Sequence, residues 1–406
     1  SRYPHETQVR SNGGRHENGP LPEDIVTLGD IFSGAGYEAV HFGKTHDFDT
    51  LRGFRIVEKG ALPLSEPPDP AWQANHETQI DNDTTAKITS WLRDRADTTP
   101  FLAVADLQNP HNICGWVGDH ASEDGPVENT TPSNDPLPEL PPNFETEDMI
   151  KRPTPIQYLC CSHRRQRQAA KWTPENFRHY YAAYRHYTEV VDAHMGKIFE
   201  TLTAQGCNDN TLVLIMADHG DMMGSHRMVT KQVCFYEEVS RIPFIWAGPG
   251  VSRCGGIDRN NLVSLIDLVP TLCEYAGLPV PEGVRGQSIL PLLTGGTAEA
   301  VPFVASEWHT EWGYTISPGR MIRTPRYKYT RYLENDGEEL YDLENDPFET
   351  RTLVDDPAYA AALEQHRRLL DRHIAETEDD FYNLHCHADR QWRSHLPGFE
   401  NHNGPS

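Results

Sequence analysis

Short apolar runs that end in polar clusters are the feature that most constrains the fold of this chain. They cover residues 39–42, 101–105, 211–216 and 242–246. Continuous apolar runs of this length are typical of buried parallel strands. Helical stretches alternate with them, at about residues 81–95, 174–204 and 262–275. The alternation predicts an α/β fold with a mostly parallel central sheet flanked by helices. Thr173 followed by Pro174 predicts the start of the long second helix.

The pattern changes after about residue 300. Residues 321–332 alternate in polarity and are followed by GEELY at 337–341, which predicts antiparallel strands, and a helix is expected at about 359–376. We therefore expect residues 1–300 to form the catalytic α/β domain and residues 301–406 a smaller C-terminal α+β subdomain, with an irregular end. Two segments rich in Pro, Asn, Asp and Gly, about 60–80 and 110–172, are expected to be long loops.

The charge of the chain excludes some partners. Its 36 Lys and Arg against 60 Asp and Glu give a net charge of −24 at pH 7, without the basic footprint of a nucleic-acid binder. No apolar run reaches the roughly 18 residues that a membrane span needs. The eight Cys contain no CxxC pair, so a structural zinc ribbon is not expected.

Three of the predicted strands run directly into dense polar clusters. These are GKTH at 43–46, QNPHN at 108–112 and ADHGD at 217–221, and Lys231 lies between the third strand and the next. Open parallel sheets bind ligands beyond the carboxyl ends of their strands, so we expect these clusters to meet. Their lysines, imidazoles and carboxylate suit an anionic tetrahedral group held by a metal and by cations. Each cluster alone could be a solvated strand end or a capping turn, but three at one edge favour a metal-assisted hydrolase.

The same residues resemble the sulfatases of the alkaline phosphatase superfamily. The resemblance extends over about residues 2–353, and Thr45 stands where the family usually has Trp. The matching motifs, in order, are RYPH (2–5), GY…GKTH (36–46), NPH (109–111), TLVLIMADHGD (211–221), K…YEE…RIP (231–243), GPG (248–250), DLVPT (267–271), RTPRYKY (323–329) and ELYDLENDP (339–347). Their order and spacing together are specific, and they imply an alkaline-phosphatase-like fold.

The resemblance implies a role for each polar residue. Asp218 and His219 would bind a divalent cation, usually Ca²⁺, although an imidazole ligand leaves Mn²⁺ or Zn²⁺ open. Lys44 would hold the nucleophile and nearby anionic oxygens, and His46 would act as the base that helps to expel sulfate from the covalent intermediate. His111 and Lys231 would bind the sulfate and assist the departing alcohol, by protonation or by charge. The family's nucleophile is a formylglycine hydrate, made from Cys or Ser in C/S-x-P-S/A-R.

One part of the family pattern is absent from this sequence. None of the eight Cys is followed by x-Pro-Ser-Arg or x-Pro-Ala-Arg, and the paired Asp ligands usual near the family's N-terminus are also absent. We therefore expect formylglycine and the remaining metal ligands upstream of Ser1, and the chain by itself to be inactive. The resemblance implies a periplasmic, secreted or lysosomal enzyme, although the chain carries no targeting segment.

The expected activity is hydrolysis of a sulfate ester, with a carbohydrate sulfate as the expected substrate by analogy. Trp308 and His309 are candidate substrate-binding residues, because aromatic rings stack on sugars; a packing or surface role is the alternative. Two other functions stay open: a phosphodiesterase or phosphonate monoester hydrolase of the same superfamily, and a non-catalytic relative that binds sulfated glycans.

Overall fold

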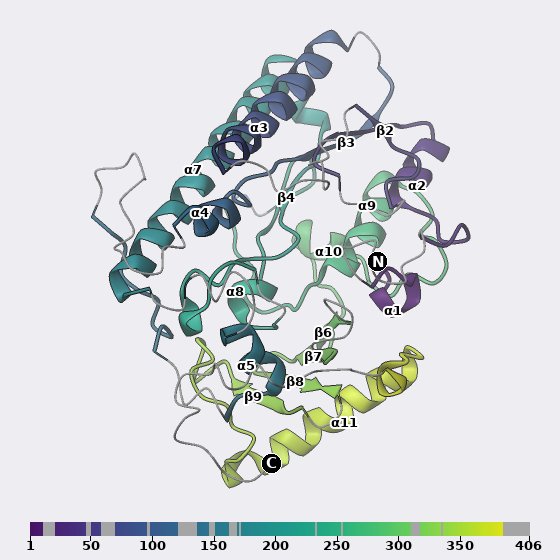
Figure 1. Ribbon diagram of the computed structural model, residues 1–406. Coiled ribbons are helices and arrows are strands. Elements are labelled where there is room, and N and C mark those ends of the chain that lie inside the picture. Colours follow the sequence, from purple (N-terminus) through teal and green to yellow (C-terminus); the bar gives the residue numbers. More distant parts are fainter. Residues whose placement is uncertain are drawn as a thin grey trace.

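A parallel sheet with the strand order β2-β1-β3 forms the base of the candidate site (Figure 1). In this computed structural model, β1 (Glu38–Gly43) pairs in parallel with β3 (Phe101–Asp106) and with β2 (Arg55–Ile56). The structure describes residues 1–10, 21–45, 50–57, 70–95, 98–120, 136–145, 151–161, 169, 172–231, 234–252, 255–309, 317–333 and 336–384. The predicted strands at 39–42 and 101–105 are confirmed.

Two long helices cover one face of this sheet. In Figure 1, α3 (Pro70–Asp94) and α7 (Pro174–Ala204) run side by side. Their apolar residues meet the β1 side chains in a core cluster whose buried members are Val40, Phe42, Ile88, Leu92, Ile198 and Leu202. The predicted helix at 174–204 is confirmed, and the Thr173 side chain caps it by accepting a hydrogen bond from the Asn176 amide at 3.3 Å.

The strands β4 (Val213–Met216) and β5 (Phe244–Ala247) form a separate pair among the described strands. The alternation of helices and strands predicted parallel neighbours, but this pair is antiparallel, with Val213 opposite Ala247. A parallel pair needs a crossover connection, usually a helix. In its described residues, the segment between these strands holds only a 3₁₀ turn (Ser225–Arg227) and the short helix α8 (Glu237–Ser240), and the chain returns in the opposite direction.

The C-terminal part is an antiparallel sheet with one helix packed on it (Figure 1). Its strands are β6 (Val304–Trp308), β7 (Gly319–Arg323), β8 (Tyr327–Tyr332) and β9 (Glu338–Asp342). The helix α11 (Ala360–Glu376) contributes Leu363, Leu370 and Ile374 to the core beneath it. The predicted antiparallel strands and the helix at 359–376 are confirmed, and the domain boundary at residue 300 stays a prediction.

The segments expected to be long loops contain helices. Helix α3 begins at Pro70, and α4 (Ile113–Asp119) and α5 (Thr154–Cys161) lie within residues 110–172. Trp116 and Val117 of α4 pack in a buried cluster with Phe177 and Tyr180 of α7, so tertiary packing outweighs the Pro- and Gly-rich composition. Within the second segment, residues 136–145 are also described and contain turns but no helix or strand. Residues 60–69, most of the remaining positions between 121 and 171, and the end that was expected to be irregular from residue 385 lie outside the described residues.

The remaining helices connect these layers. They are α1 (Pro4–Thr7), α2 (Leu28–Gly34), α9 (Leu268–Ala276) and α10 (Leu290–Leu293). The predicted helix at 262–275 corresponds to α9, which is preceded by one 3₁₀ turn at Leu265–Asp267.

The first seven residues contact both parts of the chain. The Ser1 carbonyl accepts from the Arg285 amide at 2.9 Å, and the Ser1 hydroxyl accepts from the Val269 amide at 3.2 Å. Four residues later, the His5 ring contacts Glu307 of β6 at 2.6 Å and the Thr377 carbonyl, just after α11, at 3.0 Å. This segment therefore joins the region around α9 to the C-terminal sheet.

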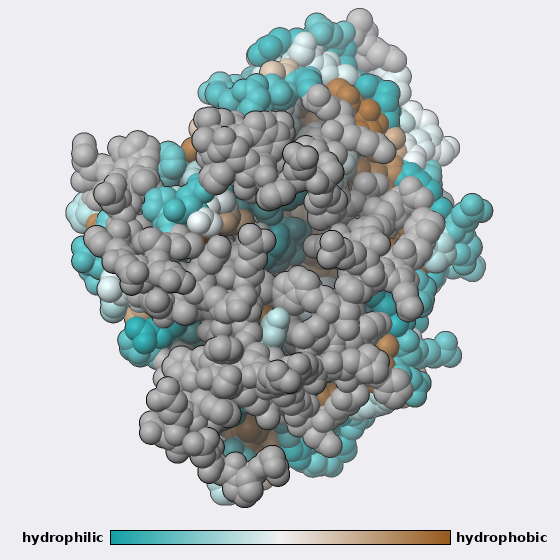
Figure 2. Space-filling model, viewed as in Figure 1, coloured by the Kyte–Doolittle hydropathy of each residue, from teal (hydrophilic) through white to brown (hydrophobic). Residues whose placement is uncertain are grey.

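Hydrophilic residues make up most of the described surface on the face seen in Figure 2. No helix in the described part of the chain is both long enough and apolar enough to cross a membrane.

Candidate active site

The carboxyl ends of β1 and β3 are held together directly. Gly43 lies opposite Asp106 in the parallel register, and the Lys44 amide donates to the Asp106 carbonyl at 3.1 Å. Gly43 has φ +96°, and a Cβ there would lie 2.2 Å from that carbonyl oxygen, so the position requires glycine. Lys44 is thus fixed at the carboxyl end of β1, where the sequence placed it, and its role in catalysis stays a prediction.

Two lysines and an aspartate interact at this edge. Burial lowers the pKa of Lys44, the neighbouring Lys231 lowers it further, and Asp218 and Asp106 act in the opposite direction. The structure therefore brings Lys44, Lys231 and Asp218 within electrostatic range, although they are far apart in the sequence. Two ammonium groups that repel each other favour an anion between them. His46 lies outside the described residues, and its predicted role stays a prediction.

Asp218 and His219 follow β4 and face each other. The His219 Nε2 atom is 3.4 Å from Asp218 Oδ2, and 86% of the Asp218 side chain is exposed. The His219 Nδ1 atom is 2.8 Å from the Gly220 carbonyl oxygen, which can only accept, so Nδ1 carries the proton. When the ring is neutral, it presents the Nε2 lone pair beside a carboxylate. A histidine ligand to a metal is usually fixed in this way, by a hydrogen bond at its other nitrogen.

Tyr180 of α7 holds the segment between Asp218 and Lys231 in place. Its buried hydroxyl donates to the Asp221 carboxylate and accepts from the Thr230 amide at 2.7 Å. The two contacts tie both ends of this segment to one helix, and Thr230 directly precedes Lys231. Sequence reasoning missed Tyr180, because nothing in the helical pattern separates a tyrosine with a buried hydroxyl partner from one that only packs.

His111 follows β3 and is half-buried. Its Nδ1 atom lies 2.9 Å from Gln108 Nε2, and its amide donates to the Gln108 carbonyl at 3.0 Å. The Asn109–Pro110 peptide bond between these residues is cis. This loop continues from β3, whose last residue pairs with the end of β1, so His111 and Lys44 extend from neighbouring strand ends.

Trp308 and His309 belong to a different cluster. The His309 side chain is 2% exposed and contacts Glu307 at 3.1 Å, and the partly buried Trp308 packs against an apolar cluster. Their predicted role in substrate binding stays a prediction.

A group of potential metal ligands lies beside His309, formed by His5, Glu307 and Asp379. Both His5 ring nitrogens face oxygen atoms, at Glu307 and at the Thr377 carbonyl. Burial alone would lower the pKa of His5, but the hydrogen bond and charge of Glu307 raise it above its ordinary value. A doubly protonated imidazole has no lone pair for a metal, so this group is an ion network instead.

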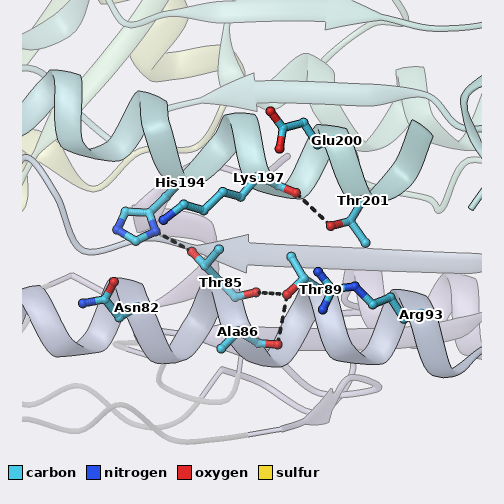
Figure 3. A pocket seen from close by; sticks show the side chains of 9 residues that line it. All are labelled: Asn82, Thr85, Ala86, Thr89, Arg93, His194, Lys197, Glu200 and Thr201. Carbon is cyan, nitrogen blue, oxygen red and sulfur yellow. Dashed lines mark hydrogen bonds between the residues drawn. The ribbon is translucent and has the colours of Figure 1, made fainter. Parts of the chain in front are cut away.

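A polar cavity of about 270 Å³ lies between α3 and α7 (Figure 3). Thr85 of α3 and His194 of α7 meet in it through a 2.8 Å contact between Oγ1 and Nδ1. Its lining comes from these two helices and not from the strand ends, so it is separate from the candidate active site.

Comparisons with known proteins agree with this arrangement. Residues 1–278 match the family model described as Sulfatase, and residues 224–376 match N-sulphoglucosamine sulphohydrolase, C-terminal. The chain is 48% identical, over 404 residues, to the Delta 4,5-hexuronate-2-O-sulfatase of Bacteroides thetaiotaomicron, covering 99% of this chain and 82% of that protein.

Solved structures give the same result. A 2-O GAG sulfatase is 47% identical and superposes with a TM-score of 0.89, covering 100% of this chain and 86% of the other. A phosphonate monoester hydrolase of Agrobacterium radiobacter, 20% identical with a TM-score of 0.73, covers 93% of this chain and 84% of the other and shares the fold. The fold, the strand-end lysines and a match along nearly the whole chain lead to one conclusion: this chain belongs to the sulfatase family, whose members hydrolyse sulfuric esters.

Proposed function

We propose that the enzyme hydrolyses a carbohydrate sulfate ester, specifically the 2-O-sulfate of a hexuronate residue. The observation that carries this proposal is the 48% identity along almost the entire chain to a Delta 4,5-hexuronate-2-O-sulfatase. The 2-O GAG sulfatase structure supports it with a TM-score of 0.89. The phosphonate monoester hydrolase shares only 20% identity, so its likeness extends to the fold and not to the substrate.

In this proposal the two lysines bind the sulfate group. Lys44 and Lys231 repel each other, and an anion between them relieves that repulsion. Their charge also stabilises the negative charge that develops on the departing alcohol. His111 is assigned to the same oxygen, and His46 to expulsion of sulfate from the covalent intermediate.

Asp218 and His219 would hold a divalent cation, with Ca²⁺ as the expected ion. The donor set fits a metal, because the exposed carboxylate and the Nε2 atom of His219 lie 3.4 Å apart and the other ring nitrogen is fixed by Gly220. When bound, the ion would supply a positive charge that polarises the sulfate oxygens.

A formylglycine hydrate as the nucleophile belongs to the same proposal, and it would supply the attacking oxygen. A periplasmic, secreted or lysosomal location and a catalytic domain ending near residue 300 are proposed with it, by analogy with the family.

Substrate specificity tests the proposal. The full-length enzyme is incubated with unsaturated disaccharides that carry a single sulfate at the 2-O, 6-O or N position, and with an aryl phosphate diester, and released sulfate and phenol are measured. We expect sulfate release from the 2-O-sulfated uronate alone. Preferred cleavage at another position, or of the phosphate diester, would overturn the assignment, and binding without any hydrolysis would favour a glycan-binding protein.

Metal content tests the ligand pair. Asp218→Ala should remove the bound divalent ion from the full-length protein, as measured by elemental analysis after gel filtration. Asp209→Ala, which removes an exposed carboxylate elsewhere, should leave the metal content unchanged. An unchanged metal content in Asp218→Ala would refute the assigned site.

A further inference from the structure

A fully buried carboxylate lies behind the loop that carries His111. Asp81 of α3 is 0% exposed, and it accepts hydrogen bonds from the Gln108 amide, from the Asn109 amide at 3.1 Å and from Asn109 Nδ2 at 2.7 Å. A carboxylate without such donors would be costly to bury. All three donors belong to the loop that follows β3, so Asp81 fixes the path of that loop.

The same loop also orients the ring of His111, through the side chain of Gln108. Gln108 is also buried, and its Nε2 atom lies 2.9 Å from His111 Nδ1. A carboxamide nitrogen only donates hydrogen bonds, so Nδ1 must accept, and the proton of the neutral ring resides on Nε2. Asp81 is connected in this way to one tautomer of His111, through the backbone and then the side chain of Gln108.

Helix α3 itself is anchored next to Asp81. Thr85 lies one helical turn further along and contacts His194 of α7 at 2.8 Å, and both side chains are buried (Figure 3). The same long helix α7 carries Tyr180, which holds the segment that leads to Lys231. The loop that carries His111 is therefore bonded to α3, and the segment that leads to Lys231 is bonded to α7, which packs against α3.

We propose that Asp81 and Gln108 are positioning residues that hold His111 as the neutral Nε2–H tautomer. As the bond between sulfur and the alcohol oxygen breaks, His111 offers a hydrogen bond to the departing oxygen and keeps its own proton. That oxygen takes its proton from water, and the hydroxide ion so formed is released to solvent. This inference rests on the proposed function for the role of His111, but the tautomer itself does not depend on it. It decides between the two roles that the family resemblance left open, protonation and charge stabilisation.

The tautomer is measured by long-range ¹H–¹⁵N spectroscopy of the ¹⁵N-labelled full-length protein at neutral pH, with the His111 signals identified by their loss in His111→Gln. We expect the Nε2–H pattern in the wild type. In Gln108→Glu the new carboxylate can only accept, so the pattern should change to protonation at Nδ1. An Nδ1-protonated ring in the wild type would overturn the proposal, because Gln108 would then present its oxygen.

The positioning role is measured by kinetics on a 2-O-sulfated substrate. Asp81→Asn replaces an acceptor by a donor that faces other donors, so the loop must shift, and we expect kcat to fall about 100-fold with KM unchanged. Asp94→Asn, an exposed carboxylate on the same helix, is the matched control and should retain full activity. If Asp81→Asn does not fold, Gln108→Met takes its place, because it removes only the contact to His111 at similar volume.

The outcomes separate the two proposals. A folded Asp81→Asn or Gln108→Met protein with unchanged kcat would overturn the positioning role. A wild-type enzyme that hydrolyses no sulfate ester would overturn the proposed function, and the tautomer measurement would still decide the state of His111.

Discussion

Lys328 in the C-terminal sheet and Lys44 at the end of β1 are both fully or partly buried, but their charged neighbours differ. Lys328 of β8 is 1% exposed, and its ammonium group lies 2.7 Å from Glu237 and 2.9 Å from Glu349. Lys44 lies beside a second cation, Lys231. Burial opposes the charge of both lysines, but the two carboxylates raise the pKa of Lys328, whereas Lys231 helps to lower the pKa of Lys44.

The difference separates structural charge from functional charge. In and around the C-terminal sheet, buried cations have partners within the protein: Arg320 contacts Asp379 at 2.6 Å, and Arg152 contacts Glu339 at 3.5 Å. At the strand ends, two cations are placed together against their mutual repulsion. An anionic substrate can therefore bind to a chain with a net charge of −24, because the local field decides at short range.

Removing Lys328 should have the largest effect on stability. Lys328→Ala leaves the buried carboxylate of Glu349 and the partly buried carboxylate of Glu237 without their cation, so the free energy of unfolding should fall by about 3–5 kcal/mol. Urea denaturation measures this loss, and Lys197→Ala, which removes an exposed lysine of α7, should change it little. A loss as small as that of Lys197→Ala would show that the contacts around Lys328 are not a tight ion network.

Removing Lys44 should instead reduce activity and leave stability unchanged or higher. In the full-length enzyme, Lys44→Ala should reduce kcat/KM by about 10²–10³-fold, since a cation that stabilises developing charge is lost. The free energy of unfolding should stay the same or rise, because the repulsion from Lys231 disappears. Parallel kinetics and denaturation measure both quantities. A Lys44→Ala variant that is destabilised but fully active would show that Lys44 stabilises the fold and does not serve catalysis.

Tyr180→Phe should give a smaller and mixed effect. Without the hydroxyl, Asp221 loses a donor and the Thr230 amide loses its acceptor, so the free energy of unfolding should fall by about 1–3 kcal/mol. Activity should fall as well, since Thr230 precedes Lys231. Tyr181→Phe, one residue further along the same helix, is the control. If both variants have the same activity and the same free energy of unfolding, the Tyr180 hydroxyl does not help to hold the segment that leads to Lys231.

The smallest effect concerns pH and the ion pair of His5 with Glu307. The folded-state pKa of His5 is raised, so this pair contributes its full stability below the unfolded pKa of about 6.5 and loses it as the pH rises through the folded value. The difference in unfolding free energy between wild type and His5→Gln should shrink from pH 6 to pH 9 in denaturation experiments. A difference that grows with pH would mean that His5 is neutral.

The sequence allowed most of the main elements to be predicted, together with the polar residues that follow β1, β3 and β4, because both follow from local patterns. The apolar runs of β1 and β3 and the polar residues after them needed no knowledge of long-range contacts. The antiparallel pairing of β4 with β5 depends on the path of the chain between them, which composition does not encode. Asp81 and Tyr180 were missed for a related reason, because their hydrogen-bond partners are distant in the sequence. The Gln108 amide lies 27 residues from Asp81, and the Thr230 amide lies 50 residues from Tyr180.

The contacts of the first seven residues have a consequence for how the protein opens. Ser1 is bonded beside α9, while His5 is bonded to β6 and to the turn after α11. Separation of these regions would break both sets of contacts within one short stretch of chain. Amide hydrogens on either side of this stretch should therefore exchange with solvent in a single concerted opening, and cleavage of the chain between Ser1 and His5 should convert it into two independent ones.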